Sequence, residues 1–134
     1  MAGSRKMAEL HGTLWRLRCT GCSAVRDDRR VPLPELPPRC GCGSVLRPDV
    51  VWFGEVLPQE AVRRAFEAAR RAEVVLVIGT SSVVYPAAAI PELAREAGAC
   101  VVEVNPEPTP LTPLAHLSLR GTAADVVPAL VGGA

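Results

Sequence analysis

From Val50 onward, apolar and polar residues alternate in blocks, and these blocks, beginning with strand character at Val50–Phe53, predict a β-α-β-α-β order. The apolar run Val74–Ile78 has no polar break, which favours a central strand buried on both faces. Residues 59–71 before it place apolar side chains on one helical face and arginines on the other. A helical stretch to about Glu96 and a second apolar strand, Cys100–Val104, follow it. This order predicts an α/β fold, a parallel sheet with helices on both faces.

Local signals define the expected ends of these elements. Pro86 suits the first turn of the helix that follows the strand, where a missing N–H costs nothing. Pro91 interrupts the helical pattern, so we expect a kink or a short first helix there. Gly98 occupies a position typical of a C-cap. Thr122, with Asp125 three residues later, predicts the start of a last helix.

The first half of the chain predicts short strands around a segment that cannot build a core. Thr13–Leu17 and Val50–Phe53 have strand character. From Ser23 to Arg39 the sequence holds charges and prolines without helical periodicity, so something other than hydrophobic burial should stabilise this segment. Since few convincing sheet strands are present, we expect the sheet to have an unfilled edge or a partner.

Four cysteines flank that polar segment. Cys19 and Cys22 form a C-x2-C pair, and Cys40 and Cys42 form a C-x-C pair. Thiolates on two tight turns can face one ion, and four of them complete the closed tetrahedral sphere of a structural zinc. Disulfides or ordinary thiols are the alternative, but clustered cysteines in a reducing compartment more often bind metal. Cys100 is interpreted as a small buried apolar residue.

Composition narrows the class of function. The 134 residues, 49% apolar and 22% charged, suit one compact domain, and a net charge of +1 gives no reason to expect nucleic acid or a membrane as a partner. The arginines around Asp27 and Asp28 are expected to form a solvated surface, because no aromatic residue is interleaved to stack on bases. No apolar run approaches the roughly 20 residues that cross a bilayer, and no signal-peptide pattern is present, so we expect a cytoplasmic protein.

The turn after the strand Val74–Ile78 is a candidate ligand site. Residues 79–82 read Gly-Thr-Ser-Ser, which places backbone N–H groups and hydroxyls at the carboxyl end of the predicted sheet. Open α/β sheets bind ligands at that edge. By itself the turn is equally compatible with simple packing.

Five short motifs follow one another along the chain. They are E-L-H-G at 9–12, the two cysteine pairs taken together, R-P-D-V-V-W-F-G-E at 47–55, G-T-S-S-V-V-Y-P-A-A at 79–88, and N-P-E at 105–107. In this order they resemble the sirtuins, a family of NAD-dependent protein-lysine deacylases. The resemblance runs from about Ala2 to Val131, and the Trp52-Phe53 pair is most similar to the bacterial group that includes desuccinylases. It implies removal of acyl groups from lysine, with release of nicotinamide and O-acyl-ADP-ribose.

The resemblance also implies roles for individual residues. His11 corresponds to the general base for a ribose hydroxyl, a task suited to an imidazole because it takes up a proton near neutral pH. Phe53 is implied to line the acyl-lysine tunnel within a segment that pairs with the substrate peptide as an added strand. A buried strand with Trp52 and Phe53 in the core is the alternative. The implied substrate-binding residues are Val51, Trp52, Phe53, Gly54, Glu55, Val84 and Tyr85. The implied cofactor-binding residues are Gly79, Thr80, Ser81, Asn105, Pro106, Glu107 and Ala123. His116 matches no motif.

The implied architecture is an incomplete Rossmann-like sheet, residues 46–134, with a zinc-ribbon module inserted at 18–45. Sirtuins also have a glycine-rich G-A-G loop and a Q-N-I-D motif ahead of the histidine, and neither stands in this sequence. We therefore expect the chain to be the carboxyl-terminal part of a sirtuin-type catalytic domain, truncated or mis-started. Because phosphate cradling supplies much of dinucleotide binding, weak NAD affinity and no measurable deacylase activity are expected of it alone.

Two further expectations concern partners. Acylated-lysine peptides are the implied substrates, and an exposed sheet edge favours self-association. The alternative to an enzyme is a non-catalytic, zinc-containing module that docks an extended peptide or a partner chain.

Overall fold

The computed structural model describes Ser4 and residues 6–132, which fall into two compact units, Met1–Ala61 and Val62–Ala134. Each unit has its own three-stranded sheet. Among the described residues, no helix combines the length and apolarity that a bilayer crossing requires.

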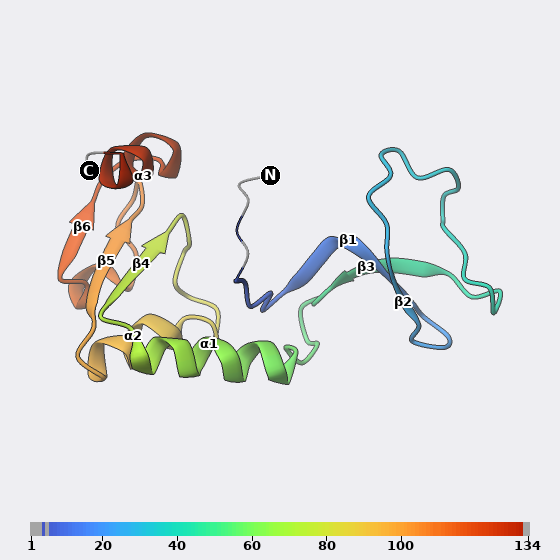
Figure 1. Ribbon diagram of the computed structural model, residues 1–134, viewed down its shortest axis with the longest axis horizontal. Coiled ribbons are helices and arrows are strands. Elements are labelled where there is room, and N and C mark those ends of the chain that lie inside the picture. The colour runs from blue at the N-terminus through green and yellow to red at the C-terminus, as the bar shows by residue number, and fades with distance from the viewer. Residues whose placement is uncertain (1–3, 5, 133–134) are drawn as a thin grey trace. The chain divides into compact units, whose positions relative to one another are not determined.

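The first unit is built on an antiparallel sheet with the strand order β2-β1-β3 (Figure 1). Its strands are β1 (Gly12–Cys19), β2 (Val25–Asp27) and β3 (Leu46–Val50). The core of this unit is small and consists of Leu17, Cys19 and Leu46, with Leu33 and Cys40 packed against it. The predicted strand at Thr13–Leu17 is confirmed and extends further at both ends. So small a core agrees with the expectation that hydrophobic burial alone does not hold this region.

The predicted strand at Val50–Phe53 is wrong. The strand lies earlier, at Leu46–Val50, and pairs antiparallel with β1 instead of joining a parallel sheet. Its charged residues and Pro48 hid it from the apolar pattern. Beyond Val50 the chain turns, and Trp52 and Phe53 are 56% and 100% exposed, so the alternative that they form a core is also wrong.

The second unit contains the parallel sheet, with the strand order β4-β5-β6 (Figure 1). Its strands are β4 (Val74–Ile78), β5 (Cys100–Val104) and β6 (Leu117–Leu119). The helices are α1 (Gln59–Arg71), in which the boundary between the units falls, α2 (Ala89–Glu96), a 3-10 helix (Thr112–Leu114) and α3 (Ala123–Val131). The α/β class and the bounds of α1 are confirmed, whereas β6 was not predicted.

Small side chains make the core of the second unit. Ala69 of α1, Ala94 of α2 and Ala99 are buried together, and partly buried apolar residues surround them. In β5, residues 101–104 are all buried, which makes β5 the central strand of the unit. Alanines at these contacts allow the helix backbones to approach the sheet closely.

Two predictions of burial are wrong. In β4, Val74, Leu76 and Ile78 are exposed while the residues between them are half-buried, because β4 is an edge strand with one face uncovered. Cys100 is also exposed, since it is the first residue of β5 and precedes the buried stretch. An apolar run therefore located these strands but did not predict which faces are covered.

The ends of α2 differ in part from the prediction. The helix begins at Ala89 and not at Pro86, and Pro91 lies buried in its first turn, where a proline is tolerated, so the proline does not divide a longer helix as expected. At the other end Gly98 follows the C-cap residue Ala97 and has a φ of 96°, the left-handed conformation common after a helix.

The predicted cap of the last helix is confirmed and gives a testable consequence. Thr122 Oγ1 accepts a hydrogen bond from the Asp125 amide at 3.3 Å and donates to Asp125 Oδ2 at 2.6 Å. Thr122→Ala is expected to lower the free energy of unfolding of the second unit by about 1 kcal/mol. Urea denaturation followed by circular dichroism measures this loss. Thr122→Ser keeps the hydroxyl and serves as the control; an equal loss in both variants would contradict the capping role.

Candidate functional site

Three loops follow the carboxyl ends of the three parallel strands in the second unit. The arrowheads of β4, β5 and β6 point to one edge of the sheet, where α3 lies (Figure 1). Six of the predicted cofactor-binding residues fall in these loops: Gly79, Thr80 and Ser81 after β4, and Asn105, Pro106 and Glu107 after β5. The seventh, Ala123, is the first residue of α3, which follows β6. This is the edge at which open α/β sheets bind ligands.

The side chain of Asn105 joins two of these loops. Its Nδ2 donates to the carbonyl oxygen of Thr80 at 2.7 Å, and its Oδ1 accepts from the amide of Glu107 at 3.3 Å. Both ends of the carboxamide are therefore bonded within the protein. The structure thus brings Thr80, Asn105 and Glu107 together, while their role in cofactor binding stays a prediction.

Ser82 is an unusual residue at the same edge. Its φ is 54°, a left-handed conformation that is rare outside glycine, and its Oγ is buried without a hydrogen-bond partner among the described residues. Strained backbone and unpaired polar groups concentrate at functional sites. The sequence did not single out Ser82, because neither the strain nor the unpaired hydroxyl can be recognised from a G-T-S-S string.

In the first unit, the backbone places His11 beside the predicted peptide-binding segment. The amide of Val51 donates to the carbonyl oxygen of His11 at 3.0 Å, and Gly12 pairs with Val50 in the ladder. His11 is an exposed residue in the turn immediately before β1. His11 and Val51 are thus neighbours, although their roles in the reaction stay predictions.

The segment 51–55 is a turn held by its own Glu55 and by Arg47 of β3. Glu55 accepts the Trp52 amide at 2.9 Å and pairs with Arg47 Nη2 at 2.7 Å. The Arg47 guanidinium also lies 4.2 Å from the centre of the Trp52 ring, a cation–π contact. These contacts leave Phe53 fully exposed at the tip of the turn.

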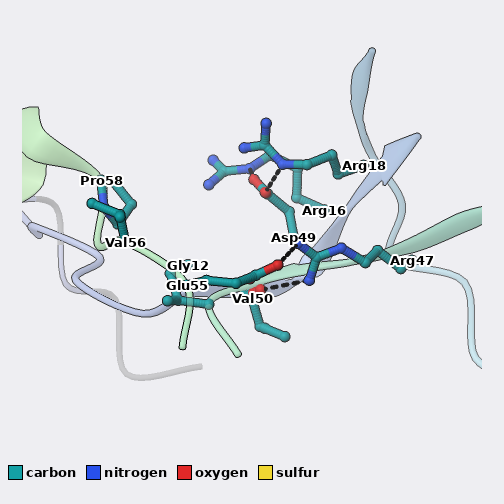
Figure 2. Close-up of a pocket in the computed structure, with 10 residues that line it drawn as sticks. Gly12, Arg16, Arg18, Arg47, Asp49, Val50, Glu55, Val56 and Pro58 are labelled. Carbon is teal, nitrogen blue, oxygen red and sulfur yellow. Dashed lines mark hydrogen bonds and ion pairs between the residues drawn. The ribbon is translucent and has the colours of Figure 1, made fainter. Parts of the chain in front are cut away.

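A cavity of about 490 Å³ lies beside this segment in the first unit (Figure 2). On one side the Asp49 carboxylate accepts hydrogen bonds from Arg16 Nε at 2.6 Å and from Arg18 Nε at 2.7 Å. Burial raises the pKa of the Asp49 carboxyl, but the hydrogen bonds from Arg16 and Arg18 outweigh it and hold that pKa below its usual value. The carboxylate is therefore charged near neutral pH and joins β1 to β3 through side chains.

Neutralising Glu55 is expected to loosen the turn. The Trp52 amide, and then Arg47, lower the pKa of Glu55, so its contacts contribute fully above the unfolded-state pKa of about 4.3 and are lost as pH falls through the lower folded-state value. At neutral pH, Glu55→Gln should accelerate amide hydrogen exchange at Trp52 roughly several-fold, because a charge-assisted bond becomes a neutral one. Glu73→Gln is the control at an exposed position outside the turn. An unchanged rate in Glu55→Gln would contradict this account.

The four paired cysteines form one cluster in the first unit. All four Sγ atoms lie within 4.8 Å of one another, with Cys19 and Cys42 at 3.5 Å and Cys22 and Cys40 at 3.7 Å. A tetrahedral zinc with Zn–S bonds of about 2.3 Å requires sulfurs about 3.8 Å apart. These separations are far longer than a disulfide bond, so the cluster fits a closed structural zinc site.

Backbone amides prepare the cluster for thiolates. The amides of Gly21 and Cys22 both donate to Cys19 Sγ at 3.4 Å. The Cys22 amide, with that of Gly21, lowers the pKa of Cys19, and the Ser44 amide and side chain lower the pKa of Cys42 to about 6. For Cys22, the Ala24 amide lowers the pKa, but the neighbouring sulfurs raise it to about 11. Several thiolates this close together repel one another, and a bound divalent cation offsets that repulsion and keeps the thiols deprotonated.

Residues 1–86 match the model of the Sir2 family. This chain belongs to that family. Over 131 residues it is 56% identical to NAD-dependent protein deacylase 2 of Pyrobaculum aerophilum, a match that covers 97% of this chain and 52% of the relative. The chain thus spans about half the length of the curated relatives it matches.

Solved structures of Sir2 proteins have the same fold. A complex of a triple mutant of Sir2 homologues with 2'-O-acetyl ADP ribose superposes with a TM-score of 0.91 at 45% identity, covering 98% of this chain and 53% of that one. Sir2Tm bound to a propionylated peptide superposes with a TM-score of 0.87 at 34% identity, covering 98% and 57%. The sirtuin resemblance seen in the motif order is therefore confirmed.

Proposed function

We propose that this Sir2-family chain carries part of the site of an NAD-dependent protein-lysine deacylase, of the deacetylase or desuccinylase type. One observation carries the proposal: the bond from Asn105 to Thr80 places the loops after β4 and β5 side by side at the ligand-binding edge of the parallel sheet. Membership of the family, and a relative whose name is NAD-dependent protein deacylase 2, support it.

NAD is the proposed co-substrate of the second unit. Residues 79–81 are assigned to the loop that runs along the cofactor, and Asn105 to Glu107 to the adenosine ribose, with a backbone contact from Ala123 to adenine. When bound, NAD supplies the ADP-ribosyl group that accepts the acyl group. The short, hydroxyl-rich 79–81 loop suits this role because its backbone amides can approach a ligand closely.

His11 is the proposed general base. Its imidazole accepts a proton from a ribose hydroxyl, which makes that oxygen a better nucleophile toward the transferred acyl group. The hydrogen bond from the Val51 amide to the His11 carbonyl fixes the backbone at His11. The proposed base and the proposed peptide-binding segment are therefore tied together through the backbone.

Acylated-lysine peptides are the proposed substrates. The exposed turn at 51–55 offers backbone groups to an extended peptide, and Phe53 at its tip is free to line an apolar path for the acyl-lysine side chain. Val84 and Tyr85, which are also exposed, are assigned to the same substrate. The propionylated peptide bound to Sir2Tm supports this class of ligand.

A cytoplasmic location and self-association complete the proposal. A thiolate–zinc site needs reduced cysteines, which supports a cytoplasmic location. The open edge of β4 favours self-association at high concentration.

Titration of the chain with ADP-ribose and with an acylated peptide, followed by NMR, tests the proposal. ADP-ribose is expected to shift the amide signals of residues 79–81 and 105–107, and the peptide those of 51–55. Peptide binding with no ADP-ribose shift at any concentration would favour the alternative, a zinc-containing peptide-binding module, for which the exposed Trp52 and Phe53 are the supporting observation.

A variant pair tests the base. His11→Ala should reduce any NAD-dependent deacylation to background while leaving both binding shifts in place. His116→Asn is the matched control, because His116 Nδ1 only accepts the Val101 amide at 3.0 Å and asparagine retains an acceptor. Deacylation that survives His11→Ala would overturn the assignment.

A further inference from the structure

Glu103 is a charged residue in the middle of the buried central strand. Its side chain is only 1% exposed, and it faces three hydroxyls and one guanidinium. The hydrogen-bond donors are Thr109 Oγ1, Thr112 Oγ1 at 2.7 Å and Ser118 Oγ at 3.1 Å, and Arg120 Nη1 forms an ion pair with the carboxylate at 3.2 Å. A buried carboxylate is costly unless it is hydrogen-bonded and paired, and this one is both.

The partners of Glu103 all lie in or after the loop that follows β5. Thr109 and Thr112 also bond within that loop, since the Thr109 amide donates to Thr112 Oγ1 at 2.8 Å and the Leu111 amide to Thr109 Oγ1 at 3.1 Å. The loop is therefore folded back onto the strand from which it departs. Burial raises the pKa of Glu103, but the hydrogen bonds from Thr109, Thr112 and Ser118, with Arg120, hold it below its usual value, so the carboxylate is ionised near neutral pH.

Arg120 extends this network to the candidate cofactor residues. Its Nη1 donates to the carbonyl oxygen of Glu107 at 3.0 Å and to that of Asn105 at 3.4 Å, while Nη2 donates to Thr112 Oγ1 at 3.2 Å. A guanidinium presents its donors in a rigid planar fork. Glu103 anchors one side of the fork, so the carbonyls of Asn105 and Glu107 are held at set positions relative to β5.

We propose that Glu103 is a positioning residue for the cofactor loop: through Arg120 and the two threonines it holds Asn105 where its carboxamide reaches Thr80. Glu103 is placed to touch no ligand itself. The expected effect on NAD binding rests on the proposed function, but the placement of Asn105 by Glu103 does not. An apolar residue at this position would leave Arg120 and three hydroxyls without their shared acceptor, and the loop would lose the contact that selects one conformation.

Glu103→Gln tests the proposal because it keeps the shape and removes the charge. Hydrogen exchange at the Nδ2 group of Asn105 is expected to accelerate about tenfold or more, while the amides of β5 between Val101 and Val104 keep their protection. ADP-ribose affinity should fall by a similar factor, and binding of an acylated peptide to residues 51–55 should not change. A role limited to general stability would instead remove protection from β5 and Asn105 together.

Arg120→Lys is the second variant, at a residue that is partly exposed and whose replacement keeps the charge. Lysine lacks the planar fork that donates to two carbonyls and Thr112 while pairing with Glu103, so the same pattern is expected. If wild-type chain shows no ADP-ribose binding, the proposed function fails, yet the exchange at Asn105 still decides the positioning role. Unchanged Asn105 exchange in both variants, or joint loss of β5 protection, would overturn it.

Discussion

Removal of zinc by a chelator is expected to unfold at least residues 18–45. The core of the first unit holds few buried side chains, among them Leu17, Cys19 and Leu46, and one of these is itself a predicted zinc ligand. Zinc binding to small thiolate sites contributes on the order of 10–16 kcal/mol, far more than a core of this size can supply. Amide exchange across β1, β2 and β3 should therefore rise toward the unfolded rate on chelation.

The second unit provides the internal control for that experiment. Its core of Ala69, Ala94 and Ala99 contains no cysteine of the cluster, so protection of β5 is expected to persist after chelation. Measured zinc content should fall from about one ion per chain to none, and Cys42→Ser should reproduce the effect. A circular dichroism spectrum and exchange pattern that do not respond to chelation would exclude a structural metal.

Gly12→Ala is expected to be the most damaging single substitution of a glycine in the first unit. Gly12 has a φ of 72°, and a Cβ added to it would overlap the carbonyl oxygen of Asp49 and lie 3.0 Å from its carbonyl carbon. Relief requires the backbones of β1 and β3 to separate beside His11. A strained left-handed residue combined with a backbone clash should cost about 3 kcal/mol or more.

Gly41→Ala is the matched control for Gly12→Ala. Gly41 also lies in the first unit, but no heavy atom lies within 4 Å of an added Cβ there and its φ is not in the left-handed region. Denaturation of both variants should show a large loss for Gly12→Ala and little change for Gly41→Ala. Equal stability of the two would mean that β1 and β3 adapt at this point, contrary to the geometry of Asp49.

The sequence located elements wherever one local pattern was decisive. Helix α1 was predictable because its apolar face and arginine face repeat with the helical period, and the cap at Thr122 because its chemistry is local. β3 was missed because its three central residues are Arg, Pro and Asp, and Asp49 is stabilised there by partners on β1 that lie far away in sequence. β6 has three residues, too few for a periodic pattern.

The candidate site was predictable by position but not by contact. Ordered motifs placed Gly79 and Asn105 after the right strands, and the structure joins their loops through Asn105. Glu103 was missed because a single acid in an apolar strand gives no indication of its donors, which come from residues 109–120. Which face of β4 is covered depends on neighbouring strands and helices, and an apolar run carries no information about them.

The carboxamide of Asn105 has a thermodynamic consequence as well as a structural one. Because one side chain is bonded to both loops, the loops keep or lose their order together. Ordering a residue costs about 1–2 kcal/mol of conformational entropy, and here folding has already ordered both loops before any ligand arrives. If the proposed cofactor binds here, the two loops would act on it as one cooperative unit. Removing the Asn105 carboxamide would replace one preorganised pair of loops with two loops that order independently and bind more weakly.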